Sequence, residues 1–164
     1  MFVRTKKVNN NIYAYFVKNR WINGRTSQTT VKYIGRVYPF VLANDVGFMQ
    51  FSGLEGRSVS NRELLKSLVG WELFKHGFKK EKKCWVGGGI DVDADSFSFS
   101  KNGKEVALAF NDGFLSKATV NRILNFAVSD RDEDGYSFAK AFVEAGIKVP
   151  QPVFVHIFSN LRRK

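Results

Sequence analysis

The stretch that decides the amino-terminal fold is IYAYFVKNRWINGRTSQTTVKYIGRV, residues 12–37. Its first part is rich in β-branched and aromatic residues, which favour strands. Asn23-Gly24 is the strongest short signal for a two-residue hairpin turn, and the residues after it supply the returning strand. A weakly alternating segment at residues 1–7 precedes this hairpin. The sequence therefore predicts a three-stranded antiparallel meander.

Alternation with a period of two divides the first strand of the hairpin into two faces. One face holds Ile12, Ala14 and Phe16, and the other holds Tyr13, Tyr15 and Val17. One of them must pack on the rest of the protein. We expect the tyrosine-bearing face to be the exposed one.

The charge of the chain is concentrated at its amino-terminal end. Lys and Arg number 26 against 15 Asp and Glu, so the net charge is +11. The first 44 residues contain no acidic residue. They hold cations interleaved with aromatic residues: Arg4, Lys6, Lys7, Tyr13, Tyr15, Lys18, Arg20, Trp21, Arg25, Lys32, Tyr33 and Arg36. Like charges repel unless an anion neutralises them, and flat rings stack on bases, so this set predicts a nucleic-acid-binding surface.

The alternative interpretation of this region is structural. In that interpretation the aromatic residues are the core of the sheet, and the cations are a solvated surface. A second basic run, interrupted only by Glu81, predicts a further phosphate-contacting patch at Lys79, Lys80, Lys82 and Lys83. Cations after a helix are also expected from the helix dipole alone.

The rest of the chain predicts segregated strands and helices. Residues 39–59 are irregular and contain several glycines, which indicates a loop or linker. Ser60 with Glu63 three residues later forms a capping box that begins a long helix. We therefore expect an α+β fold with these parts: a basic antiparallel three-stranded meander over 1–38, the linker over 39–59, and a body over 60–164 with a long helix, a β-hairpin and three short C-terminal helices. All of them together form one compact domain or a main domain with an appendage.

No catalytic residue, metal ion or cofactor is predicted. Asp91 and Asp93 alternate on an expected strand, where successive carboxylates on one face lie roughly 7 Å apart, which is wide for one ion. Glu72 with Asp91 or Asp93 is the best carboxylate set for a metal-dependent nuclease. The following strand lacks the acid-x-Lys pair usual for such nucleases, so this activity stays an alternative. The single Cys84 excludes an intramolecular disulfide and a cysteine zinc cage.

The start of the chain has no signal-peptide pattern, and no apolar run approaches the ~18 residues of a membrane span. We therefore expect no membrane partner and a cytoplasmic protein, associated either with the nucleoid or with a ribonucleoprotein.

One part of the sequence resembles a known family. The residues Tyr13–Val17, Arg20, Gly24 and Gln28–Val37 look like the amino-terminal region of DDE-type insertion-sequence transposases, which ends in Val-Lys-x-(Ile/Leu)-Gly-Arg. The resemblance implies attachment to DNA, with Lys32 and Arg36 at the basic positions of the closing strand. It does not imply transposition, because no three-carboxylate pattern of the catalytic core is visible. The remainder of the chain resembles uncharacterised archaeal proteins, which assigns no activity.

Together these observations predict a non-catalytic nucleic-acid-binding protein that contacts mainly phosphates, with little sequence specificity and with DNA favoured over RNA. The first alternative is an RNA-binding component of a ribonucleoprotein such as a ribosome, which would share this charge and composition. A metal-dependent nuclease is the second. A protein–protein adaptor, whose first sign would be homodimerisation, is the third.

Overall fold

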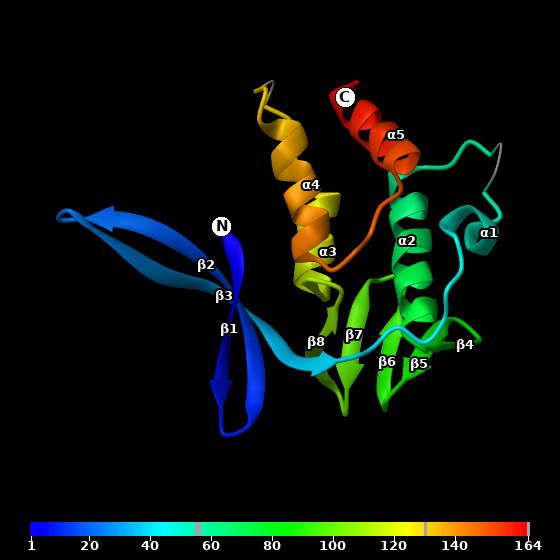
Figure 1. Cartoon of the computed structure of the whole chain (residues 1–164), viewed down its shortest axis with the longest axis horizontal. Helices are drawn as coiled ribbons and strands as arrows, with labels where there is room; N and C mark the ends of the chain where they lie inside the picture. The colour runs from blue at the N-terminus through cyan, green and yellow to red at the C-terminus, as the bar shows by residue number, and fades with distance from the viewer. Residues whose placement is uncertain (55–56, 130, 164) are drawn as a thin grey trace.

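The structure is a computed structural model that describes residues 1–54, 57–129 and 131–163 (Figure 1). The strands of the described residues are β1 (Phe2–Val8), β2 (Asn11–Ile22), β3 (Arg25–Pro39), β4 (Lys79–Glu81), β5 (Cys84–Gly87), β6 (Ile90–Asp93), β7 (Ser98–Lys101), β8 (Lys104–Phe110) and β9 (Gly113–Leu115). Their helices are α1 (Phe48–Ser52), α2 (Asn61–Lys75), α3 (Lys117–Leu124), α4 (Asp134–Glu144) and α5 (Gln151–Arg162). None of these helices combines the length and the apolar character that crossing a membrane requires.

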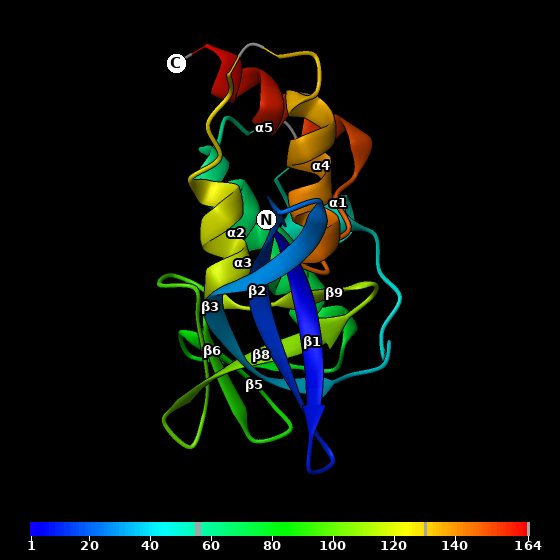
Figure 2. The same cartoon turned by 90° about the vertical axis from the view of Figure 1, so that its left-hand side faces the viewer.

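The nine strands belong to one mixed sheet in the order β1-β2-β3-β8-β7-β6-β5-β4, with β9 also paired to β8. Neighbouring strands are antiparallel except β3 and β8, which run parallel from Arg36 opposite Val106 to Pro39 opposite Ala109. The helices gather on one side of the body strands, while the distal part of β2 and β3 projects away from the body (Figures 1 and 2).

Strand β8 contributes to two separate clusters of buried side chains. Val106, Leu108 and Phe110 belong to the main core, which lies between the helices and β5–β9. Ala107, on the opposite face of the same strand, belongs to a small cluster beneath the meander. The other buried members of this small cluster are Ala14, Phe16, Ile34 and Val37.

The fold predicted from the sequence is wrong. The prediction was an α+β fold with a separate meander, one long helix, one hairpin and three short helices. The strands form one nine-stranded mixed sheet, and the parallel β3–β8 pair makes the meander part of it. Two strands, β4 and β9, were not expected, since each has only three residues. The expected linker also contains α1. Parallel pairing between distant segments leaves no local sequence signal, because its partners are far apart in the chain.

The capping box predicted for α2 is confirmed. The backbone N–H of Glu63 donates to Ser60 Oγ at 3.2 Å, and the backbone N–H of Ser60 donates to Glu63 Oε2 at 2.9 Å. These reciprocal hydrogen bonds satisfy donors that the first turn of a helix leaves free, which fixes where α2 begins.

Gly35 lies where β3 meets β8. Its φ is +152°, and a Cβ at this position would lie 3.0 Å from the backbone of Val106. Residues other than glycine rarely adopt that φ, and real Cβ atoms rarely approach a backbone so closely. A glycine at position 35 therefore allows the meander to pair with the body.

We expect Gly35→Ala to lower the free energy of unfolding by about 2–4 kcal/mol, because it adds both backbone strain and a clash with β8. Gly24→Ala is the matched control, since Gly24 has a φ of +76° but nothing within 4 Å of an added Cβ. Strain alone should cost this control about 1 kcal/mol. Urea denaturation measures both variants, and equal losses would contradict the account of the β3–β8 contact.

Candidate nucleic-acid interface

The distal part of β2 and β3 is a two-stranded ribbon, which we define as residues 18–29. Strand β1 pairs with β2 only as far as Phe2 opposite Val17, so the ribbon residues of β2 and β3 pair only with each other. Every residue from 18 to 33 is exposed. Figure 1 shows this ribbon projecting away from the body. Both of its faces are therefore open to a partner.

The predicted turn at the tip of the ribbon is confirmed. Asn23 and Gly24 have φ values of 49° and 76°, and Ile22 pairs with Arg25 on either side of them. Positive φ at both central residues is typical of the hairpin turn that Asn-Gly favours. Next to this turn Trp21 is 74% exposed, so a large aromatic ring lies in solvent at the tip.

Nearer the body, three tyrosines form a cluster on the exposed face of the meander. Tyr33 lies 5.4 Å from Tyr15 and 6.4 Å from Tyr13 between ring centroids. Tyr33 itself is 49% exposed. Partial burial, followed by the neighbouring phenols of Tyr15 and Tyr13, raises the pKa of Tyr33, so its hydroxyl stays protonated and can donate a hydrogen bond.

Three cations surround this tyrosine cluster. Arg4 lies opposite Tyr15, and Lys6 and Arg36 lie opposite Tyr13 in the two adjacent strand pairs. Period-two alternation places these partners on the same face of the sheet. An open groove of about 470 Å³ on this side is lined by Arg4, Thr5, Lys6, Tyr15, Val17, Gln28 and Thr30. We call this surface the tyrosine face.

The structure divides the other predicted amino-terminal cations from the tyrosine face. Lys32 lies opposite the buried Phe16, and Lys7 lies opposite Ile12. Lys18 and Arg20 alternate with Asn19 and Trp21 along the ribbon. Alternation gives Lys7, Lys18, Arg20, Arg25 and Lys32 to the opposite face of the meander and ribbon. The cations are therefore distributed over both faces of a protruding element.

The amino-terminal cations lack partners among the described carboxylates. The ion pairs of the described residues are Lys66–Asp95, Lys75–Glu72 and Arg122–Glu144, and His76 Nδ1 lies 3.7 Å from Glu72 Oε2. None of them involves a cation from the first 44 residues. Arg4 donates instead to the neutral side-chain oxygen of Gln28, and the Arg36 guanidinium lies 5.1 Å from the centroid of the Tyr38 ring. Neither contact neutralises a positive charge.

The second predicted basic patch lies at the other end of the sheet, on the β4–β5 hairpin. Lys79 pairs opposite Val86 and Lys80 opposite Trp85, so these two lysines lie on opposite faces of β4. Lys82 and Lys83 form the connecting turn. This patch does not join the tyrosine face, since β1 and β4 are the two ends of the strand order.

The carboxylates of Asp91 and Asp93, considered above for a metal site, do not form one in the structure. Asp93 accepts hydrogen bonds from Ser96 Oγ at 2.9 Å and from the backbone N–H of Asp95 at 2.8 Å. These bonds, that of Ser96 Oγ first, lower the pKa of Asp93. Asp91 is exposed on the same strand. Within the described ranges no three His, Cys, Asp or Glu side chains come close enough to hold one metal ion.

Glu72 is fully buried and has a structural set of partners. It accepts hydrogen bonds from Lys75 Nζ at 3.0 Å, from Asn111 Nδ2 at 3.1 Å and from the backbone N–H of Lys148 at 2.8 Å. Its carboxylate thus joins α2 to the β8–β9 turn and to the segment before α5. Because all three donors come from the protein, Glu72 acts as a buried, satisfied charge.

The search for relatives found no match to this chain among protein-family models, curated proteins or solved structures.

His76 next to Glu72 makes the stability of the body pH-dependent. Its ring stacks on Phe110 with centroids 3.9 Å apart, and burial lowers the pKa of His76 although Glu72 acts in the opposite direction. In the unfolded chain, His76 therefore binds a proton near pH 6.5, whereas in the folded chain it binds one only at lower pH. We expect the free energy of unfolding to be largest above about pH 6.5 and to fall as the pH drops below it.

Urea denaturation at several pH values between about 5 and 8 measures this dependence. His76→Phe should flatten it, because it removes the buried imidazole. An unaltered slope in His76→Phe would show that another group causes it.

Proposed function

We propose that this chain is a non-catalytic nucleic-acid-binding protein that contacts mainly phosphates through the tyrosine face and the ribbon. One observation supports this most strongly: the amino-terminal cations are exposed and lack a partner among the described carboxylates. Such cations bind the phosphates of a polynucleotide and release its condensed counterions. This release contributes a large favourable binding free energy at low salt.

The shape of the ribbon favours DNA over RNA. The major groove of B-DNA is about 12 Å wide and admits a two-stranded β-ribbon, while the major groove of A-form RNA is too narrow and deep for side chains to read. The cations at Lys18, Arg20 and Arg25 on one face of the ribbon would contact the phosphates that border the groove. This preference agrees with the attachment to DNA implied by the transposase-like segment.

The aromatic residues would add contacts that do not depend on base identity. Tyr33 and its two neighbours offer partly exposed rings on which sugars or unpaired bases can pack, and each stacked base is worth about 1–3 kcal/mol. Phosphate and stacking contacts carry no sequence information. We therefore expect weak discrimination between sequences, as suits a nucleoid-associated protein.

The combined substitution Arg4→Ala, Lys6→Ala and Arg36→Ala tests the tyrosine face. We expect it to weaken binding to a 20-base-pair duplex by at least tenfold, because three phosphate contacts are lost. Fluorescence anisotropy of labelled duplex at fixed salt gives the measurement. The matched control is Lys104→Ala, Lys117→Ala and Lys140→Ala, which removes three exposed lysines from the body and should change affinity by less than about threefold.

Equal loss of affinity in both triple variants would reject the tyrosine face as the interface. Tighter binding to structured RNA than to duplex DNA at matched salt would favour the ribonucleoprotein alternative. Cleavage of supercoiled DNA in Mg²⁺ or Mn²⁺ that disappears in Asp91→Ala with Asp93→Ala would contradict the non-catalytic assignment.

A further inference from the structure

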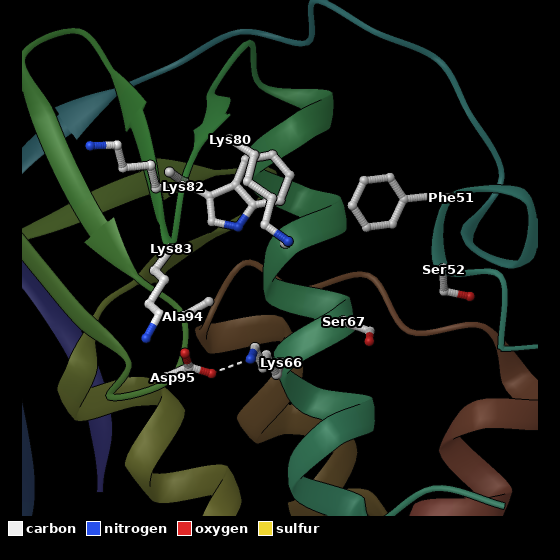
Figure 3. Close-up of a pocket in the computed structure, with 11 residues that line it drawn as sticks. Phe51, Ser52, Lys66, Ser67, Lys80, Lys82, Lys83, Ala94 and Asp95 are labelled. Atoms are coloured by element: carbon white, nitrogen blue, oxygen red, sulfur yellow. Dashed lines mark hydrogen bonds and ion pairs between the residues drawn. The ribbon is translucent and has the colours of Figure 1, made fainter. Parts of the chain in front are cut away.

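A basic cavity of about 510 Å³ lies at the opposite end of the sheet from the ribbon, among α1, α2 and the β4–β5 hairpin (Figure 3). Phe51 and Ser52 come from α1, Lys66 and Ser67 from α2, and the lysines of the hairpin complete the wall. Its size falls within the ~300–1,000 Å³ typical of small-molecule sites. We call it the lysine cavity.

Positive charge dominates the lysine cavity. Lys66, Lys80, Lys82 and Lys83 line it, and Asp95 is its single lining carboxylate. Asp95 pairs with Lys66, as the dashed line in Figure 3 marks. The hairpin lysines have no ion pair with a described carboxylate. The cavity therefore has about three uncompensated positive charges within one concave surface.

The remaining polar groups of the lysine cavity also suit an anion. Trp85 lines the cavity, and its indole Nε1–H is a hydrogen-bond donor. Ser52 and Ser67 add hydroxyl groups. Apart from Asp95, every lining side chain with a polar group can donate a hydrogen bond.

An apolar wall adjoins these donors. The Phe51 ring centroid lies 6.2 Å from that of Trp85, and the indole packs on α2 where a Cβ at Gly70 would lie 3.2 Å from its Cζ2 atom. The absence of a side chain at Gly70 lets the indole lie against the helix. A ligand that bears both phosphates and a ring would meet complementary surfaces here.

We infer that the lysine cavity binds a nucleoside polyphosphate, with its phosphates at Lys80, Lys82 and Lys83 and its ring against Phe51 and Trp85. This site is independent of the proposed interface. A polynucleotide backbone fits less well, because the cavity lies across the sheet from the tyrosine face. Exposed Asp91 on β6 and Glu105 on β8 also interrupt the basic surface between the two.

Isothermal titration of the full chain with ATP at about 150 mM salt tests this inference, with inorganic tripolyphosphate and adenosine as comparison probes. ATP should bind, tripolyphosphate should bind more weakly, and adenosine should bind weakest. Lys80→Ala with Lys83→Ala should weaken ATP binding by at least tenfold, because two of the phosphate-binding charges are lost. The control pair Lys104→Ala with Lys117→Ala should bind ATP like the unaltered chain.

Three results would overturn the inference: no ATP binding at millimolar concentration, equal losses in both lysine pairs, or unchanged ATP binding in the cavity pair. In the last case, weaker duplex binding by the variant Lys80→Ala with Lys83→Ala would show that these lysines contact nucleic acid. Separately, the triple variant at Arg4, Lys6 and Arg36 should retain its affinity for ATP whether or not it binds DNA. A failure of the proposed function is therefore distinguishable from a failure of this inference.

Discussion

The parallel pairing of β3 with β8 is the contact on which the arrangement of the molecule depends. It runs over four residue pairs, from Arg36 opposite Val106 to Pro39 opposite Ala109, and is the connection of the meander to the body within the sheet. The buried cluster beneath the meander is small and takes Ala107 from β8. A meander with so little core of its own would be marginally stable alone. The pairing therefore stabilises the meander and sets the direction in which the ribbon projects.

The consequence for charge is a contrast between the two parts of the chain. In the body, Lys66 and Arg122 pair with Asp95 and Glu144. In the meander and ribbon the cations are exposed and lie far in sequence from the acids, the first of which is Asp45. Self-repulsion of these cations opposes the compact state and is relieved by a polyanion. This is why we place the nucleic-acid contact on the projecting element and a smaller phosphorylated ligand in the lysine cavity.

Local signals in the sequence predicted several features. The Asn23-Gly24 turn and the capping box at Ser60 depend on neighbouring residues, so the sequence contains all the information they need. The tyrosine face was also predicted from alternation. Alternation failed at its two ends, since Ile12 is 42% exposed and Val17 is 5% exposed. Ile12 pairs with Lys7 next to the β1–β2 turn, at the edge of the meander. Near Val17, a bulge on β3 shifts the register and increases the twist of the strands, which simple alternation ignores.

Features that depend on distant segments were not predictable in this way. The β3–β8 pairing joins residues about 70 positions apart, and loop closure over that distance leaves no periodic pattern. Lys66 was not associated with the lysines of the β4–β5 hairpin, because only the packing of α2 on that hairpin brings them to one cavity. Glu72 was grouped with Asp91 and Asp93 for the same reason, although its partners are Lys75, Asn111 and Lys148.

The most direct test of the central claim is the salt dependence of binding to duplex DNA. If the amino-terminal cations bind phosphates, the logarithm of the association constant should fall linearly with the logarithm of salt concentration, with a slope of about −4 or steeper. That slope corresponds to a loss of about two orders of magnitude between 50 and 200 mM salt. A slope shallower than about −1, or binding that salt does not weaken, would contradict the claim that these charges hold a polynucleotide.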